Sequence, residues 1–165
     1  MTNHVTNVVV AGLGGQGVIK ASDILADVAF RAGLDVKKAE VHGMSQRGGS
    51  VSTDVRFGAN VLSPMVPAGE ADFLVVLAAD QVENNRHVLR QGGVMVVPKD
   101  IPEADLPNRR SANVALLGVL SRHLPFAESL WQAALKANLP EPLHAANMQA
   151  FDVGRRAATS GIIAA

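Results

Sequence analysis

Residues 7–17 read NVVVAGLGGQG, and this stretch decides the fold. Its β-branched start is typical of a strand buried on both faces, and the glycines after it predict a tight turn. Apolar residues then recur in steps of three and four, which predicts an amphipathic helix over residues 15–32. Gly33 follows where a left-handed helix cap is expected. The apolar positions of this helix are Val18, Ala21, Leu25, Val28 and Ala32.

The glycines between strand and helix follow the dinucleotide-binding pattern G-x-G-x-x-G. Gly12 allows a tight turn, Gly14 lets backbone approach a ligand, and Gly17 lets the helix pack closely on the strand. Free N–H groups and the positive end of the helix dipole face one point there, so the turn favours an anion. Gly15 adds flexibility and Gln16 a neutral amide donor. The alternative is a close-packed turn that binds nothing.

The rest of the chain alternates strands with helices, which predicts an α/β fold with a mainly parallel sheet and helices on both faces. One domain over residues 1–165 fits the length. An antiparallel excursion is expected after the second strand, where residues 50–57 alternate and could pair with residues 61–63. The other predicted strands are residues 35–41, 72–77 and 94–97, and the other predicted helices are residues 81–90, 113–123, 126–137 and 142–158. Asp80 and Glu83 form a capping-box-like start for the helix over residues 81–90, and Gly92-Gly93 are expected to end it. Residues 101–110 are rich in proline and charge, which indicates an irregular surface connection.

A second dense segment, residues 40–50, reads EVHGMSQRGGS. So many polar groups in a loop after a strand indicate contact with a ligand or a partner. Arg47 could bind a phosphate or carboxylate through two parallel hydrogen bonds, and the glycine pair that follows would let the loop backbone approach that group closely. The alternative is a polar surface loop. The candidate contact residues are Glu40, Ser45, Gln46, Arg47, Gly48 and Gly49.

Glu40 also permits a dinucleotide-binding interpretation. It lies 23 positions after Gly17, close to the spacing of about 20 at which an acidic residue holds the ribose of NAD. Alternatively, Glu40 pairs with Lys37, Lys38 or Arg47.

Composition excludes several classes of function. Fifteen basic and fifteen acidic residues leave no net charge, which argues against a nucleic-acid partner. The chain has no cysteine, so it cannot hold iron–sulfur clusters through thiolates. The histidines show no metal-ligand spacing, and neither a Walker loop nor a nucleophile elbow is present. Without a long apolar run or a signal peptide, a cytoplasmic protein with no membrane partner is expected. We find no catalytic residue.

Together, residues 10–18 and 40–51 resemble the gamma domain of the 2-oxoacid:ferredoxin oxidoreductases. The extended segment EVHGMSQRGG is most similar to the beta subunits of the indolepyruvate branch of that family. Two later patterns also match, N-x-x-x-L-G from Asn113 to Gly118 and N-x-x-A-F-x-x-G from Asn147 to Gly154.

The resemblance implies a subunit that is not catalytic alone and binds no cofactor alone. Such enzymes oxidatively decarboxylate a 2-oxoacid to an acyl-CoA. Thiamine diphosphate, [4Fe–4S] clusters and CoA are expected in the complex, with a large alpha subunit carrying the diphosphate cofactor and the clusters and passing electrons to ferredoxin. An NAD-dependent oxidoreductase and a nucleotide-sensing module remain the alternatives that the residues leave open.

Overall fold

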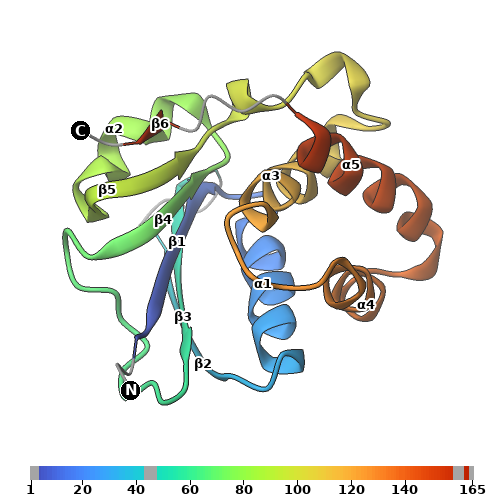
Figure 1. Ribbon diagram of the computed structural model, residues 1–165. Helices are drawn as coiled ribbons and strands as arrows, with labels where there is room; N and C mark the ends of the chain where they lie inside the picture. The colour runs from blue at the N-terminus through green and yellow to red at the C-terminus, as the bar shows by residue number, and fades with distance from the viewer. Residues whose placement is uncertain (1–3, 43–47, 158–161, 164–165) are drawn as a thin grey trace.

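The computed structural model describes residues 4–42, 48–157 and 162–163. Figure 1 shows a twisted sheet with the longer helices gathered on one side of it. These helices are α1 (Val18–Arg31), α3 (Ala112–Ser121), α4 (Glu128–Asn138) and α5 (His144–Arg156). The sheet has six strands in the order β2-β3-β1-β4-β5-β6. The strands are β1 (Thr6–Leu13), β2 (Asp35–His42), β3 (Ser50–Gly58), β4 (Ala71–Val76), β5 (Leu89–Val96) and β6 (Ile162–Ile163).

The sheet is mixed, so the prediction of a mainly parallel sheet holds only for its centre. β1 pairs in parallel with β4, and β4 with β5. β3 runs antiparallel to both β1 and β2, and β6 runs antiparallel to β5. The antiparallel excursion is therefore confirmed, but its partners are β1 and β2 rather than residues 61–63, which form no strand. β3 has taken the place beside β1 that a parallel second strand would occupy.

The two faces of the sheet are covered unequally. Val8 and Val10 of β1 face α1 and α3 in the larger core cluster, whereas Val9 and Ala11 face the smaller one. Residues of that second face pack against Val66, from the β3–β4 connection, and against the segment around the short helix α2 (Val82–Asn85). Helices thus lie on both faces, but the second face holds only one short α-helix and 3-10 turns among the described residues.

The predicted helix over residues 81–90 was wrong. Two 3-10 turns, η1 (Ala79–Gln81) and η2 (Arg86–Val88), flank α2, and β5 already begins at Leu89. Gly92 and Gly93 do not end a helix: they lie in β5, whose pairing with β4 shifts register at this point. Gly92 has a φ of 72°, the left-handed conformation that an irregular strand start requires.

The first helix agrees closely with its prediction. Val18, Ala21, Leu25 and Val28 are buried, while Ala32 is exposed because α1 ends at Arg31. Gly33 has a φ of 84° and its N–H donates to the carbonyl of Phe30, as expected of a left-handed cap. Within the described residues, no helix is long and apolar enough to span a bilayer.

Candidate functional site

The glycine turn joins β1 to α1 through two left-handed residues. Gly15 has a φ of 86° and Gly17 a φ of 82°, a region that side chains with a Cβ rarely enter. Gln16 N–H closes the turn on the carbonyl of Leu13 at 3.2 Å. Gly17 caps α1 without a side-chain hydrogen bond, and the first turn of α1 has no acidic residue. The positive end of the helix dipole is therefore not neutralised by this segment.

Gly12 was predicted to allow a tight turn, and the structure shows that close packing also requires a glycine there. A Cβ at Gly12 would lie 2.8 Å from Gln16 Oε1 and 3.1 Å from Leu77 Cβ. Gln16 Oε1 accepts a hydrogen bond from the N–H of Leu13 at 2.7 Å. The side chain thus holds the turn through its oxygen, and within the described residues its Nε2 has no acceptor. Gln16 keeps its predicted donor for a ligand and has a structural role that the sequence did not reveal.

Gly17 makes room for α3 rather than for β1, which corrects the predicted role of the third glycine. A Cβ at Gly17 would overlap Asn113 Nδ2 and lie 3.1 Å from Asn113 Cγ. Asn113 Nδ2 donates to the Gly17 carbonyl at 3.2 Å, and Asn113 Oδ1 accepts from the Val114 N–H at 2.9 Å. This carboxamide is buried, so its two bonds tie the start of α3 to the start of α1.

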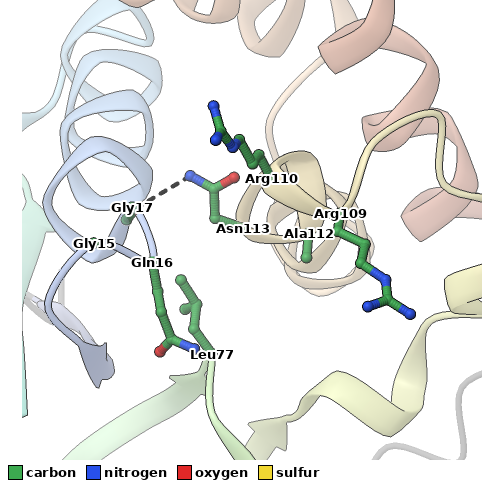
Figure 2. Close-up of a pocket in the computed structure, with 8 residues that line it drawn as sticks. All are labelled: Gly15, Gln16, Gly17, Leu77, Arg109, Arg110, Ala112 and Asn113. Carbon is green, nitrogen blue, oxygen red and sulfur yellow. Dashed lines mark hydrogen bonds between the residues drawn. The ribbon is translucent and has the colours of Figure 1, made fainter. Parts of the chain in front are cut away.

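A cavity of about 560 Å³ opens beside this junction (Figure 2). Arg109 and Arg110 project from the start of the segment that leads into α3, and Gln16 lies on the opposite wall (Figure 2). Arg109 Nε contacts Glu103 Oε1 at 2.8 Å, but both side chains are mostly exposed, so this ion pair is weak. The Arg110 guanidinium has no partner among the described residues. The cavity is lined by Gly15, Gln16, Gly17, Leu77, Arg109, Arg110, Ala112 and Asn113.

Neither arginine was predicted as a site residue, because residues 101–110 were interpreted as a surface connection. A local signal was present: Asn108 caps the 3-10 turn η5 (Arg109–Ser111), and its Oδ1 accepts from the Arg110 N–H at 2.9 Å. Asparagine is a preferred helix-starting residue, and a helix start favours an anion. What the pattern could not reveal is that this helix start faces the glycine turn.

The end of the second predicted segment closes on the glycine turn. Gly14 N–H donates to the Gly49 carbonyl at 2.8 Å, and a Cβ at Gly14 would lie 3.4 Å from the Gly48 amide nitrogen. Gly14 therefore lies close to the chain's own backbone, and the predicted approach of its backbone to a ligand stays a prediction. The candidate residues Ser45, Gln46 and Arg47 lie outside the described residues.

A second cavity, of about 450 Å³, lies on another side of the same turn. His42, within the EVHGMSQRGGS segment, and Val51, directly after it, line this cavity together with residues of the turn and of α1. The turn residues are Leu13, Gly14, Gly15 and Gly17, and those of α1 are Val18, Ile19 and Lys20. The described ends of the second segment, on either side of residues 43–47, therefore lie beside the glycine turn.

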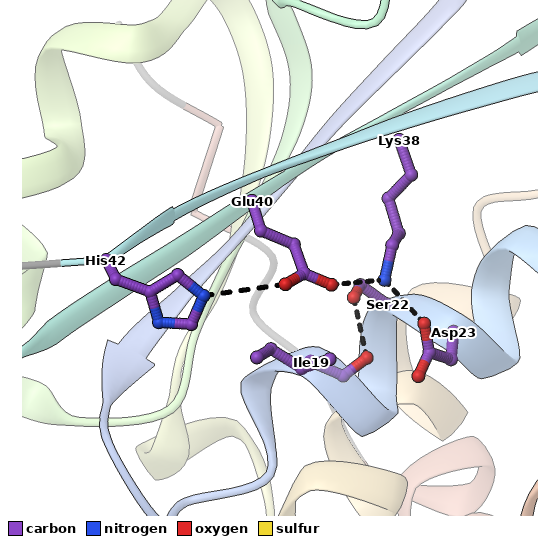
Figure 3. Close-up of polar contacts among 6 residues, drawn as sticks. All are labelled: Ile19, Ser22, Asp23, Lys38, Glu40 and His42. Carbon is purple, nitrogen blue, oxygen red and sulfur yellow. Dashed lines mark hydrogen bonds and ion pairs between the residues drawn. The ribbon is translucent and has the colours of Figure 1, made fainter.

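Glu40 does not occupy the position of a ribose-binding acid. Its Oε1 accepts from Lys38 Nζ at 2.8 Å, and its Oε2 lies 3.4 Å from His42 Nε2 (Figure 3). These hydrogen bonds, from Lys38 first and His42 second, hold the pKa of Glu40 below its usual range. Lys38 also pairs with Asp23 on α1. The alternative expectation, that Glu40 pairs with a neighbouring lysine, is thus confirmed for Lys38.

Strand order also removes the geometry of a dinucleotide site. In the dinucleotide-binding fold the acidic residue ends the strand that lies next to β1. Here β3 lies between β1 and β2, so Glu40 is separated from β1 by a strand. The NAD-binding interpretation therefore has no structural support at Glu40.

The glycines of the two later motifs serve helix packing. A Cβ at Gly118 of α3 would lie 3.1 Å from Gly154 Cα on α5, and a Cβ at Gly154 would lie 2.8 Å from the Ala115 carbonyl carbon. Asn147 Nδ2 donates to the Leu143 carbonyl at 2.9 Å, at the start of α5. The described part of the chain contains no group of three histidine or acidic residues that could hold a metal ion.

Comparison with known proteins matches this arrangement to one family. Residues 7–157 match the pyruvate ferredoxin/flavodoxin oxidoreductase family. The chain is 34% identical to the indolepyruvate oxidoreductase subunit IorB of Thermococcus kodakarensis, over 92% of this chain and 95% of that subunit.

Two solved structures share the fold. The gamma subunit of a keto/oxoacid ferredoxin oxidoreductase from Geobacter sulfurreducens has a TM-score of 0.76 at 23% identity, covering 90% of this chain and 95% of that chain. The 2-oxoglutarate:ferredoxin oxidoreductase of Magnetococcus marinus has a TM-score of 0.78 at 24% identity, covering 92% of this chain but only 30% of that chain. The protein thus belongs to the pyruvate ferredoxin/flavodoxin oxidoreductase family, with the fold of its gamma subunits.

Proposed function

We propose that this chain is the small subunit of a 2-oxoacid:ferredoxin oxidoreductase that acts on indolepyruvate or a related arylpyruvate. The observation that carries the proposal is the 34% identity to an indolepyruvate oxidoreductase subunit across 92% of this chain. The complex would cleave the bond between the carboxyl and keto carbons, release CO₂, pass the two electrons of the oxidation to ferredoxin, and transfer the acyl group to the CoA sulfur.

The redox chemistry belongs to the large subunit in this proposal. Thiamine diphosphate would be bound by that subunit. The described residues of this chain gather no group of three histidine or acidic side chains that could hold a metal ion. Iron–sulfur clusters need thiolates, and the chain has no cysteine. No chemical step is therefore placed on this chain. The large subunit and, through it, ferredoxin are its proposed partners, in the cytoplasm.

The contribution of this chain would be to bind CoA by its phosphates at the cavity beside the glycine turn. Three features support this role. The uncapped start of α1 favours negative charge, Arg110 is free to bind it, and Gln16 Nε2 is an unused donor among the described residues. Arg109 could exchange its exposed contact with Glu103 for a phosphate, because an exposed ion pair contributes little free energy.

The proposal for the second segment rests on sequence. Ser45, Gln46 and Arg47 would present donors toward the active centre of the large subunit. We expect Arg47→Lys to lower the activity of the reconstituted complex more than the stability of this chain, since lysine cannot form the two parallel hydrogen bonds of a guanidinium. Equal losses in both quantities would make Arg47 structural.

Reconstitution tests the overall function. The purified chain alone should not reduce ferredoxin with any 2-oxoacid, whereas mixing it with its large subunit should give CoA-dependent reduction with indolepyruvate in preference to pyruvate or 2-oxoglutarate. Turnover by the isolated chain would overturn the proposal, and a preference for pyruvate would refute the substrate assignment alone.

The CoA site is tested in the same complex with Arg110→Ala. Loss of one charged hydrogen bond costs about 1.5–3 kcal/mol, so KM for CoA should rise about tenfold or more. KM for the 2-oxoacid should stay unchanged. Arg86→Ala is the matched control, because Arg86 is an exposed arginine that pairs with Glu83 beside α2 and does not line the cavity. Equal KM values for CoA in the two variants would show that CoA does not bind in this cavity.

A further inference from the structure

The outer edge of β2 carries a charge pattern that complements itself. β2 ends the sheet, and no described strand pairs with its outer side. An edge strand presents unpaired N–H and C=O groups that can pair with another chain. Toward its end β2 becomes exposed, from Glu40 through Val41 to His42. The edge is also bordered by Phe30, which is 71% exposed and lines a groove with Val36 and Lys38.

Alternation along β2 assigns the charged side chains to faces. Lys38 pairs with Asp23 of α1, and Glu40 pairs with Lys38, so both lie on the face that α1 covers (Figure 3). Lys37, Ala39 and Val41 point to the opposite face, because side chains alternate along a strand. Any strand that extends the sheet past β2 must match this alternation on both faces.

Symmetry limits how two copies of β2 can pair. A twofold axis perpendicular to the sheet makes the two β2 strands antiparallel and keeps each side chain on the same face of the joined sheet. Because residues directly opposite each other in an antiparallel pair have their side chains on the same face, one residue at the axis must lie opposite its own copy. If that residue were Lys37, Lys38 or Glu40, like charges would lie directly opposite each other, which is destabilising. Centred on Val36 or Val41, the overlap would be too short to pair the strand.

Only the register centred on Ala39 avoids these conflicts. It places Lys38 opposite the partner's Glu40 and Glu40 opposite the partner's Lys38. The small Ala39 opposes itself on the other face, and the overlap runs from Val36 to His42. Lysines on an edge strand usually repel an incoming strand, but here they discriminate against every register except one.

We propose that this edge is a homodimer interface, in which β2 pairs antiparallel with β2 of a second copy about a twofold axis at Ala39. The occupant is a second copy because the charges of β2 complement those of β2 itself. The sheets of the two subunits become one continuous sheet, with Lys38 facing the partner's Glu40 twice across the axis. The inference does not depend on the proposed function, since it rests only on strand order and charge.

Charge reversal in the full-length chain tests the interface. Analytical ultracentrifugation of the wild-type chain at micromolar concentration should give the mass of a dimer. Lys38→Glu and Glu40→Lys should each weaken dimerisation by about tenfold or more, because each turns two opposed attractive pairs into repulsive ones. An equimolar mixture of the two variants should restore a dimer, which native mass spectrometry should identify as the heterodimer. Lys37→Glu is the matched control and should dimerise like the wild type.

Folding is monitored separately, since Lys38 also pairs within the subunit. Circular dichroism and melting temperature should show that the variants fold, and Ala39→Glu, which places two carboxylates at the axis on the other face, gives a second disruption that leaves the Lys38 contacts intact. A wild-type chain that stays monomeric up to hundreds of micromolar would overturn the proposal. So would a dimer that survives all three disruptive variants, or a mixture that fails to restore it. Protection of β2 from hydrogen exchange only in the presence of the large subunit would assign the edge to that partner instead.

Discussion

Replacing Gly17 by alanine tests whether the junction between α1 and α3 depends on this glycine. Two effects should lower the free energy of unfolding of Gly17→Ala. Alanine is strained at a φ of 82°, and its Cβ would overlap the Asn113 carboxamide, whose Cγ would be 3.1 Å away. Gly15 provides the matched control, because it has a φ of 86° and a Cβ there would meet no atom within 4 Å.

The control separates strain from overlap. Left-handed backbone costs an alanine about 1–2 kcal/mol, and both variants should lose this amount. Crowding in a packed site adds about 1–3 kcal/mol, which only Gly17→Ala should lose. Because Asn113 must move, its hydrogen bond to the Gly17 carbonyl is also lost, and the total for Gly17→Ala should be about 2–5 kcal/mol. For a chain of this size, 1 kcal/mol lowers the melting temperature by about 2–4 °C.

Urea unfolding followed by circular dichroism measures the free energy of unfolding for both variants. A double mutant with Asn113→Ala should recover part of the Gly17→Ala loss, since the overlapping group is then absent. Equal losses in Gly15→Ala and Gly17→Ala would refute the reasoning, because they would mean that contact with Asn113 contributes nothing beyond backbone strain.

Three further outcomes are expected. Gly154→Ala should lower the free energy of unfolding in urea by about 2–4 kcal/mol, because the new Cβ would meet the Ala115 carbonyl group, which is backbone and cannot move aside. A loss of unfolding free energy no larger than that of a typical surface substitution would contradict the close approach of α3 and α5. Burial raises the pKa of Asp54, so the folded state holds the Asp54 proton more tightly than the unfolded state does, and the wild type loses stability as this carboxyl ionises. The unfolding free energy of Asp54→Asn should therefore increase relative to that of the wild type as pH rises from about 3 to 7. A difference that does not change with pH would refute this prediction. Calorimetric titration with NAD should detect no micromolar binding, and tight binding that Glu40→Ala abolishes would restore the dinucleotide hypothesis.

Local pattern predicted the elements that depend on neighbouring residues. The β-branched run before Gly12 indicated a buried strand, and the spacing from Val18 to Val28 predicted the inward face of α1. Gly33 was identified as a left-handed cap. Each of these depends on burial or backbone conformation within one element, so the order of residues contains the necessary information.

Patterns also misled where a local signal had two structural meanings. Asp80, Glu83 and the Gly92-Gly93 pair together predicted a helix, yet the glycines form the irregular start of β5. A glycine pair permits either a helix end or a strand bulge, and pairing with β4 decides between them. Glu40 had the spacing of a ribose-binding acid, but spacing does not determine which strand lies next to β1.

By itself, the sequence determined that a strand, a glycine turn and a helix form an anion-favouring start to an α/β fold, and that this start and the EVHGMSQRGGS segment belong to one family. Only the tertiary structure decided that β3 separates β2 from β1, that Arg109 and Arg110 line one cavity with the glycine turn, and that Asn113 reaches Gly17 across 96 positions of the chain. The reason is physical: periodicity and turn chemistry act over a few residues, whereas strand order and cavity lining follow from how distant segments bury their apolar faces against one another.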